Sequence, residues 1–343
     1  MTPAGPRPRV VYTDPAWAVD GSGHFDSARA DVEREVFGPD VDLGFGPFDG
    51  AYKGSGEELH DAVRGADGLV IYRCQVTPEL LAAAGPGCKV IARSGVGVDN
   101  LNGPLLKEAG ICGFNVPDYC GDEVGTHTLA LLLALERGVV VQNRLIRAGQ
   151  WGIHRGNIPR RTAERTAGIV GFGRIGRATS RKLQAFYREV VAYDPHVPAD
   201  VMAGHGVRAV SRLEDLFEQA DAVVVHAALT AQTDHLIGAD LLGRARPGQL
   251  LVNSARGRLV DPAAVLGALE TGRLAGFGSD VFSPEDPNAD PVTRKLVERD
   301  DVVVSSHRAF LSAESELSLR RRVAAGVRGL LVDGVAPADG RVA

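Results

Sequence analysis

Short apolar runs alternate with amphipathic segments along much of the 343-residue chain. The runs are short enough for strands, and the segments between them repeat apolar residues at helical spacing. In the first part of the chain the pattern predicts strands at Arg9–Tyr12, Val41–Phe45, Gly68–Tyr72, Lys89–Ala92 and Ile111–Asn115, and helices at Ser27–Phe37, Gly56–Arg64, Pro78–Ala84 and Leu101–Ala109. Such alternation is typical of a parallel sheet covered by helices.

The pattern changes near the middle of the chain. Apolar residues keep a helical period from Asp122 to Ala148, and Gly149 follows. A helix this long and apolar is buried on several sides, so we expect it to cross between two domains. His127 on this helix is interpreted as a packed histidine rather than a ligand.

A second alternation begins at Thr166. Strands are predicted at Glu189–Tyr193, Ala222–His226, Gln249–Asn253, Leu274–Asp280 and Val302–Ser305, and helices at Leu213–Gln219, Ala239–Arg244 and Pro262–Thr271. The second sheet is expected to close near residue 307. A final helical pattern, Ala313–Val332, has no strand after it, and we expect it to return to the first domain and complete a hinge.

The start of this second alternation has the pattern of a dinucleotide-binding loop. An apolar strand ends at Gly171, Gly173 and Gly176, which are spaced G-x-G-x-x-G, and a helical pattern follows at once. Gly171 permits a tight turn, Gly173 lets backbone N–H groups approach a pyrophosphate, and Gly176 lets helix and strand pack closely. Asp194, at the end of the next strand, can bind ribose hydroxyls and repel a 2′-phosphate, which favours NAD over NADP. The alternative is a glycine-rich turn of an ordinary α/β protein.

Composition narrows the class of protein. Hydrophobic residues are 44% and charged residues 24%, as in a soluble globular chain, and the length suits two domains. A net charge of −5 argues against a nucleic-acid partner, and no apolar run is long enough for a membrane span. The N-terminus also lacks the apolar core of a signal peptide, so we expect a cytoplasmic protein with no membrane partner. The cysteines are interpreted as free thiols because they lack metal-ligand spacing; they are Cys74, Cys88, Cys112 and Cys120.

Residues just past parallel strands are candidates for binding, because these strand ends face the crevice. In the first domain they are Arg73 and the loop from Arg93 to Asn100. The glycines of this loop expose consecutive N–H groups, at Val96 and Gly97 among others, which can hold a carboxylate. A plain turn is the alternative reading of the loop.

Three charged residues at strand ends of the second domain could carry chemistry. Arg256 offers a planar fork that grips a carboxylate and polarises a neighbouring carbonyl. His307 can give or take a proton near neutral pH. Glu285 can hold that imidazole in one tautomer and favour its protonated form. Each residue alone could be a cap, a solvated charge or a loop histidine, but after a dinucleotide motif the combination indicates a catalytic site.

These residues lie in segments that resemble the D-isomer-specific 2-hydroxyacid dehydrogenases, in the branch similar to phosphoglycerate dehydrogenase and the C-terminal-binding-protein corepressors. The segments are RSGVGVDNL, NVPDYCGDEVGTHTLALLLAL, GIVGFGRIGRA, VNSARGRLVD, GSDVFSPEDP and SSHRAF. The resemblance implies an α/β fold with two doubly wound parallel-sheet domains. Residues 1–118 and 312–343 would form a flavodoxin-like substrate domain, and residues 119–311 an inserted Rossmann NAD-binding domain.

The resemblance also implies roles for single residues. Arg256 matches the family's substrate-binding arginine, Glu285 its paired acid and His307 its acid/base histidine. Val96 and Gly97 match a backbone loop for the carboxylate, and Arg73 an arginine that reaches the distal group of the substrate. The remaining matches concern NAD: Arg174 and Ile175 at the pyrophosphate, Thr230 near the cofactor, and Asp280 with the Ala255 carbonyl at the nicotinamide. A small-molecule 2-oxo or 2-hydroxy acid is the implied substrate, and a homodimer the implied assembly.

Three departures from the family pattern put the substrate in question. Ser306 precedes the histidine where proline is usual, Arg308 follows it where a small or apolar residue is usual, and Ala228 replaces a proline. Arg73 and Arg308 together suggest a substrate with a second anionic group, such as a phosphate, phosphonate or carboxylate. Oxidation of a phosphorus oxyanion such as phosphite, or a dinucleotide-sensing corepressor-like binding protein, are the alternatives.

Overall fold

The computed structural model describes residues 6–20, 25–47, 56–155 and 158–343. The chain forms two compact units, and each has its own sheet. The first unit is Met1–Tyr119 with Ser312–Ala343, and the second unit is Cys120–Leu311. The chain therefore passes between the units at Tyr119–Cys120 and at Leu311–Ser312.

The first unit is a five-stranded parallel sheet in the order β2-β1-β3-β4-β5, the flavodoxin-like order. Its strands β3 and β4 are buried along their whole length, as expected when helices cover both faces. The strands are β1 Arg9–Tyr12, β2 Asp42–Phe45, β3 Gly68–Ile71, β4 Val90–Arg93 and β5 Cys112–Phe114. The α-helices are α1 Asp31–Phe37, α2 Glu57–Val63, α3 Pro78–Ala84, α4 Gly103–Glu108 and α13 Ala313–Arg328, which continues as a π-helical turn to Asp333.

The second unit is a seven-stranded parallel sheet in the order β12-β11-β10-β9-β6-β7-β8. This is the strand order of a Rossmann fold with one further strand at β12. The strands are β6 Thr166–Val170, β7 Glu189–Tyr193, β8 Arg208–Ala209, β9 Ala222–Val225, β10 Gln249–Asn253, β11 Leu274–Ser279 and β12 Val302–Val304. The α-helices are α5 Gly121–Arg137, α6 Val139–Arg147, α7 Arg174–Leu183, α8 Ala199–Gly204, α9 Leu213–Gln219, α10 Ala239–Gly243, α11 Pro262–Glu270 and α12 Pro291–Val297.

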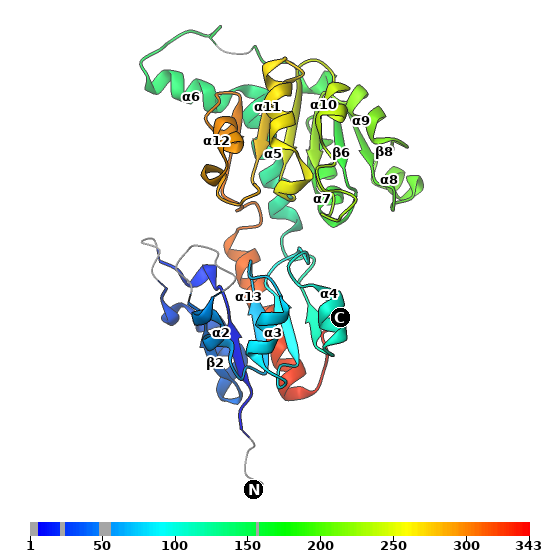
Figure 1. The fold of residues 1–343 in the computed structure, drawn as a ribbon. Helices are drawn as coiled ribbons and strands as arrows, with labels where there is room; N and C mark the ends of the chain where they lie inside the picture. The colour runs from blue at the N-terminus through cyan, green and yellow to red at the C-terminus, as the bar shows by residue number, and fades with distance from the viewer. Residues whose placement is uncertain (1–5, 21–24, 48–55, 156–157) are drawn as a thin grey trace. The chain divides into compact units, whose positions relative to one another are not determined.

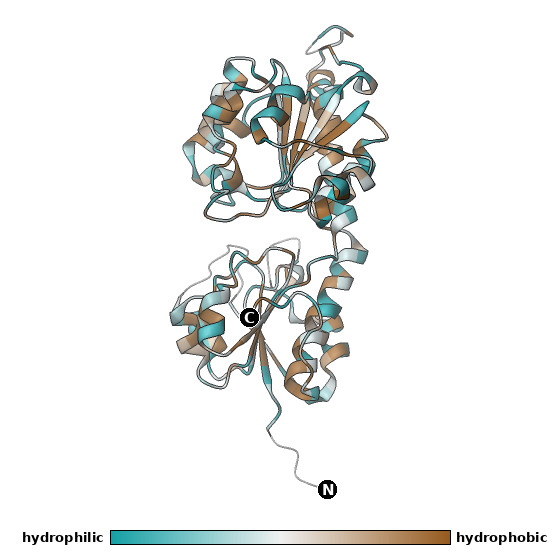
Figure 2. Ribbon diagram, turned by 90° about the vertical axis from the view of Figure 1, so that its right-hand side faces the viewer, coloured by the Kyte–Doolittle hydropathy of each residue, from teal (hydrophilic) through white to brown (hydrophobic). Residues whose placement is uncertain are grey.

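The core of the second unit lies on both faces of this sheet. One apolar cluster holds Val223 and Val225 with the helices α9 to α12, and the other holds Val224 with α5 and α7. Figure 2 shows the apolar strands inside and the polar colours on the outer faces of the helices. The predicted α/β class with two doubly wound parallel sheets is confirmed.

The prediction of one long helix from Asp122 to Ala148 is wrong. The segment forms α5 and α6, which are bent by 61° at a break. Gly138 lies in the break with φ 60°, a left-handed conformation that ends a helix. Helix α5 lies wholly in the second unit, so the predicted crossing by this helix is wrong, whereas α13 lies in the first unit, as predicted for a helix that returns to it.

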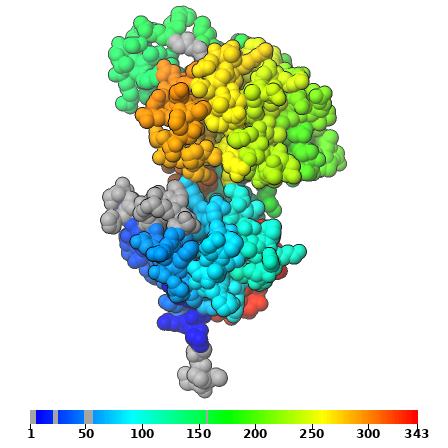
Figure 3. All heavy atoms as spheres, in the orientation of Figure 1, coloured from blue at the N-terminus to red at the C-terminus, as the bar shows by residue number. Residues whose placement is uncertain are grey.

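Smaller elements were also missed or merged. The structure adds α8, β8 and α12, and Ser27–Phe37 is a 3-10 turn followed by α1 rather than one helix. No single helix in the described part of the chain is long and apolar enough to span a membrane, and the one pair of helices that passes by length and composition is the bent pair α5 and α6. Helix α6 buries none of its residues, and it projects from the second unit in Figures 1 and 3.

Candidate functional site

The glycine-rich loop between β6 and α7 is built from two close backbone approaches. Gly171 has φ 92°, and a Cβ there would lie 2.5 Å from the backbone nitrogen of Ala227. A Cβ at Gly176 would lie 2.2 Å from the carbonyl oxygen of Gly171. Gly173 differs, because no described atom would lie within 4 Å of its Cβ. The loop therefore leaves open space at Gly173, directly before the first turn of α7.

Asp194 fixes this loop from the end of β7. One carboxylate oxygen accepts a hydrogen bond from the Phe172 N–H at 2.8 Å, and the other accepts one from the His196 N–H at 2.9 Å. The carboxylate is half-buried and lies against the loop that starts α7. This geometry brings the predicted ribose-binding acid to the predicted phosphate-binding turn.

The loop fits an NAD pyrophosphate because open space lies at the first turn of α7. Gly173 and Arg174 are exposed at the start of α7, and the ten-residue helix directs free N–H groups toward the open space. Ile175 is half-buried behind them, and Thr230 lies exposed in a turn, where its N–H donates to Thr233 Oγ1. His226 adjoins Gly171, and both of its buried ring nitrogens lack a hydrogen-bond partner among the described residues.

His307 and Glu285 form a pair in the second unit. The imidazole Nδ1 lies 2.9 Å from one carboxylate oxygen of Glu285 and 3.1 Å from the other. The His307 side chain is 17% exposed and that of Glu285 is 37% exposed, so the pair is open to a small substrate on one side. Because Nδ1 is engaged with the acid, Nε2 is the ring atom left for chemistry.

Asp280 holds the backbone of the His307 segment. His307 has φ 54°, and its N–H donates to the Asp280 carbonyl at 2.7 Å. The Asp280 carboxylate is 1% exposed and accepts from Ser305 Oγ, the Arg308 N–H and the Ala309 N–H at 2.5 to 3.0 Å. A left-handed histidine costs conformational energy, which this buried anchor offsets. In this structure the Asp280 carboxylate is occupied as an anchor for the His307 segment.

His127 joins this anchor from α5. Its Nε2 lies 2.7 Å from Ser305 Oγ and 3.5 Å from Asp280. His127, which was predicted to be a packed histidine, is thus hydrogen-bonded, and it contacts the His307 segment through Ser305. The sequence did not identify Ser305 and His127 as residues that support the His307 segment. The only available signal was the position of Ser305 in the SSH segment, two residues before His307.

Arg256 is oriented by its own loop. The Asn253 side-chain amide donates to the Arg256 carbonyl at 2.8 Å, and Arg256 Nη1 donates to the Ala255 carbonyl at 2.8 Å. A Cβ at Gly257 would lie 2.2 Å from the carbonyl carbon of Phe282. The loop that carries Arg256 therefore packs directly on the segment that leads to Glu285.

The first unit gathers positive charge at the ends of β3 and β4. Arg73 and Arg93 lie 5.4 and 5.5 Å from the ring of Tyr72, within cation–π range. The buried Asp14 carboxylate accepts from the N–H groups of residues 72 to 74 and so fixes the backbone of Arg73. Arg93, which is 8% exposed, begins the candidate loop Arg93–Asn100, but its side chain was given no role from the sequence.

The Val96 and Gly97 loop follows β4 in the same unit. Both residues are half-buried, and the Val96 carbonyl accepts a hydrogen bond from the Asn115 side chain at 2.5 Å. Arg308 belongs to the second unit, where its backbone N–H binds Asp280 and its residue is exposed.

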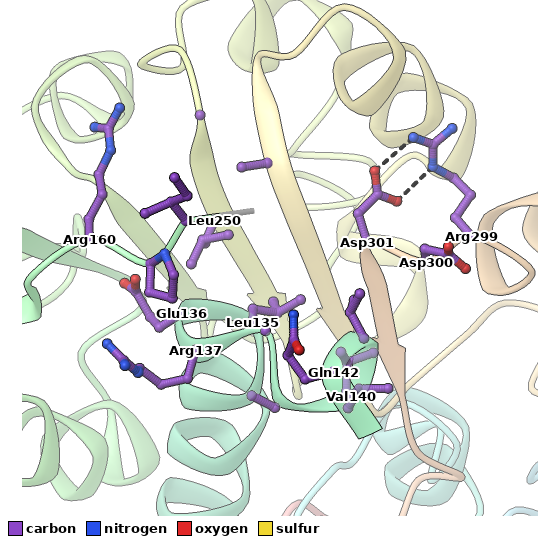
Figure 4. A pocket seen from close by; sticks show the side chains of 18 of the residues that line it. Leu135, Glu136, Arg137, Val140, Gln142, Arg160, Leu250, Arg299, Asp300 and Asp301 are labelled. Carbon is purple, nitrogen blue, oxygen red and sulfur yellow. Dashed lines mark hydrogen bonds and ion pairs between the residues drawn. The ribbon is translucent and has the colours of Figure 1, made fainter. Parts of the chain in front are cut away.

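A cavity of about 1060 Å³ lies elsewhere in the second unit, between α5, α6 and the starts of β10 to β12. Figure 4 shows its lining side chains, with Arg299 paired to Asp301 at one side. None of the predicted catalytic or cofactor-binding residues lines it.

Comparison with known proteins shows similarity to one family of dehydrogenases. The model of the D-isomer specific 2-hydroxyacid dehydrogenase NAD binding domain matches residues 129–309. D-3-phosphoglycerate dehydrogenase of Methanocaldococcus jannaschii is 32% identical over 80% of this chain and 52% of its own length. Hydroxypyruvate reductase of Thermotoga maritima is 30% identical over 76% of this chain and 83% of its own length.

Solved structures share the fold. D-lactate dehydrogenase of Aquifex aeolicus, crystallised with NAD and lactic acid, superposes with a TM-score of 0.80 at 22% identity, over 95% of this chain and 98% of that one. The chain spans about half the length of the phosphoglycerate dehydrogenases that it matches.

Proposed function

Because the chain belongs to the D-isomer specific 2-hydroxyacid dehydrogenases, we propose that it reduces a 2-oxo acid to a D-2-hydroxy acid with NADH, or runs the reverse reaction. The observation that carries the proposal is the His307–Glu285 pair beside the Arg256 loop, in the unit that has the dinucleotide loop. A proton donor, a carboxylate-binding group and a cofactor cradle are the parts that this reaction needs.

The cofactor is NAD, and residues of the second unit hold it. Gly173, Arg174 and Ile175 bind the pyrophosphate, Asp194 binds the adenosine ribose, and Thr230 and Ala255 lie toward the nicotinamide end. The Asp280 carboxylate is occupied by N–H groups of the His307 segment, so Asp280 acts at the nicotinamide end by holding the backbone of that segment. When bound, NADH supplies the hydride that adds to C2 of the oxo acid.

His307 supplies the proton of the reduction. Since Glu285 accepts the Nδ1–H, the imidazolium gives its Nε2 proton to the carbonyl oxygen as C2 is reduced. The ketone thereby becomes a hydroxyl, and the histidine is left neutral with Nδ1–H still bound to Glu285. Glu285 fixes the ring through Nδ1 and leaves Nε2 for the proton transfer.

Arg256 binds the carboxylate of the substrate. Its guanidinium is already oriented by the Ala255 carbonyl, so little freedom is lost when a planar two-pronged contact forms. In the first unit, the N–H groups of Val96 and Gly97 are assigned to a substrate carboxylate. The first unit is thus the substrate domain in this proposal, and the second unit is the NAD-binding domain.

The test is NADH consumption with a panel of 2-oxo acids that differ in the group on C3. His307→Ala should lower kcat about 10²–10⁴-fold, the usual contribution of general acid catalysis, and leave the Kd of NADH nearly unchanged. Turnover of no oxo acid by the native protein, or near-normal kcat in the variant, would refute the proposal. Phosphite with NAD⁺ belongs in the panel as the competing outcome.

We further propose that the substrate carries a second anionic group. Arg73 and Arg93 both contact Tyr72, and Arg308 adds an exposed guanidinium beside His307. A charge-assisted hydrogen bond contributes about 1.5–3 kcal/mol, so Arg73→Ala should raise KM for a phosphorylated oxo acid roughly ten- to hundredfold. The KM for pyruvate should change little in Arg73→Ala and in Arg308→Ala. If KM rose equally for the phosphorylated oxo acid and for pyruvate, or for neither, the distal anion site would be ruled out.

We also propose a homodimer formed through the second unit. The segment at and after α6 exposes Trp151, Ile153 and Ile158 by 81%, 85% and 74%, and we name these three residues the arm. An exposed apolar segment of this size marks an interface. The cavity in Figure 4 is lined by Ile153 and Ile158 together with core residues of the same unit, so the arm and this hollow adjoin one another. A twofold interface needs this kind of self-complementary face.

A further inference from the structure

The segment Gly340–Ala343 lies along the open edge of the first sheet. Arg341 pairs with Phe114 of β5 in an antiparallel bridge, and the Val342 N–H donates to the Gly113 carbonyl at 2.8 Å. The Gly113 N–H donates in turn to the Ala343 carbonyl at 3.3 Å. We name Gly340–Ala343 the tail. It continues the sheet past β5 as an antiparallel neighbour.

The tail reaches Asn115, the first residue after β5. The Asn115 N–H donates to the Gly340 carbonyl at 3.0 Å. Gly340 has φ 74°, and a Cβ there would lie 2.1 Å from the Asn115 carbonyl oxygen and 2.7 Å from its side-chain oxygen. Only glycine fits this approach, so the tail sets both the backbone and the side chain of Asn115.

Asn115 passes this constraint to the loop after β4. Its side-chain N–H donates to the Val96 carbonyl at 2.5 Å, and it is only 6% exposed. In a trans peptide the carbonyl of one residue and the N–H of the next point in opposite directions. Holding the Val96 carbonyl toward Asn115 therefore turns the Gly97 N–H away from Asn115 and fixes its direction.

We infer that Asn115 is a positioning residue for the carboxylate-binding loop, and that the tail is the element that holds Asn115 in place. This inference rests on the proposed function, because it assigns the Gly97 N–H to the substrate. Without the tail contact, the peptide between Val96 and Gly97 is free to rotate and the amide is no longer preorganised. Substrate binding then weakens, whereas the His307–Glu285 pair, which lies in the other unit, keeps its geometry.

The chain offers a matched pair of variants. Gly340→Ala places a methyl group against Asn115, whereas Gly334→Ala places one at a left-handed glycine with φ 70° and no described atom within 4 Å. Both variants carry the same backbone cost of about 1 kcal/mol, but only Gly340→Ala disturbs Asn115. Gly340→Ala should raise KM for the best 2-oxo acid about tenfold, with kcat and the Kd of NADH within twofold of native. Gly334→Ala should leave all three unchanged.

Asn115→Asp tests the donor itself. The two side chains have the same shape, but a carboxylate cannot donate to the Val96 carbonyl and repels it instead. KM should rise at least as much as in Gly340→Ala. As the pH falls and the carboxylic acid forms, its O–H can donate to Val96, so the ratio of variant to native KM should fall toward one. A structural defect would not recover in this way.

The outcomes separate this inference from the function on which it rests. If native protein reduces an oxo acid and His307→Ala does not, but Gly340→Ala and Asn115→Asp bind that acid like native protein, the inference fails alone. Equal KM changes in Gly340→Ala and Gly334→Ala would also overturn it. Hydrogen exchange gives a readout independent of turnover: the Asn115 N–H, which donates to the Gly340 carbonyl, and the Val116 N–H, which donates to the Gly95 carbonyl, should exchange faster in Gly340→Ala and at the native rate in Gly334→Ala.

Discussion

At the scale of single residues, His226 sits at the end of β9 as a buried imidazole with no hydrogen bond to either ring nitrogen among the described residues. Burial penalises the charged ring and lowers the pKa of His226 from 6.5 to about 3. In the unfolded chain the ring titrates near its ordinary value, so the unfolded state binds more protons between these two values.

His226 should therefore make the protein acid-sensitive. Its contribution to stability is complete above pH 6.5 and is lost as the pH falls toward 3. The free energy of unfolding should fall by up to about 1.4 kcal/mol per pH unit in this window, and His226→Leu should remove that slope. Urea unfolding of native and variant protein at pH 7, 6 and 5 measures this free energy. If the free energy of unfolding fell with the same slope against pH in native protein and in His226→Leu, the ring would be hydrated or paired in solution.

Asp194 should set the choice of cofactor. Its carboxylate lies at the loop where the adenosine ribose is proposed to bind, so a 2′-phosphate would meet a like charge. Asp194→Asn removes the charge and keeps an oxygen that accepts from the Phe172 N–H. We expect native kcat/KM to favour NADH strongly, and the variant to narrow the NADH-to-NADPH ratio roughly tenfold, which corresponds to about 1.4 kcal/mol. An unchanged ratio would place Asp194 away from the ribose.

At the scale of elements, the glycines of the β6–α7 turn have different tasks. A Cβ at Gly176 meets the Gly171 carbonyl, so Gly176→Ala should lower Tm by several degrees because strand and helix can no longer pack. A Cβ at Gly173 meets nothing described, and this residue has φ −71°, so Gly173→Ala should fold with a near-native Tm. The methyl group would instead occupy the space assigned to the pyrophosphate and raise the Kd of NADH at least tenfold. Native affinity in Gly173→Ala would mean that the cofactor does not approach this turn.

The sequence predicts elements well where local pattern and packing agree. The run Ala222–Val225 is apolar at every position and forms a strand buried on both faces, as the pattern predicts for a central parallel strand. The two-residue strand β8 was missed because Arg208 and Ala209 make no apolar run and pair only at the edge of the sheet. Gly138 was read as one more position in a helical period, because a glycine can sit inside a helix or end it, and only its surroundings decide.

The same limit applies to the site. Chemical type and position after a strand pointed to His307 and Glu285, and the structure brings these two within hydrogen-bonding distance. Their supports are contacts between distant parts of the chain: His127 with Ser305 across 178 positions, and Asp14 with the segment at Arg73 across 59. No spacing rule encodes such pairs. Asn115 and Gly340 belong to the same class, because a glycine near the end of the chain carries no signal of what it touches.

At the scale of the whole molecule, the arm bears on assembly. Helix α6 buries none of its own residues, and the segment after it exposes the three large apolar side chains of the arm. In a single chain in water, exposing these side chains costs free energy. In a dimer these side chains would leave water, and full burial of each is worth about 1.5–3 kcal/mol.

Replacing the arm should therefore break the dimer without unfolding the chain. Native protein should elute with light scattering at twice the 36.2 kDa of one chain, and Trp151→Ser with Ile153→Ser at the mass of one chain. Phe186→Ser is the control, because Phe186 is an apolar side chain of the same unit that is 39% exposed and lies outside the arm. The dissociated variant should keep its far-ultraviolet spectrum and the Kd of NADH, since the arm shares no residue with the β6–α7 loop. A native protein that is monomeric at micromolar concentration would refute the dimer, and an arm variant that stays dimeric while Phe186→Ser dissociates would assign the interface to another surface.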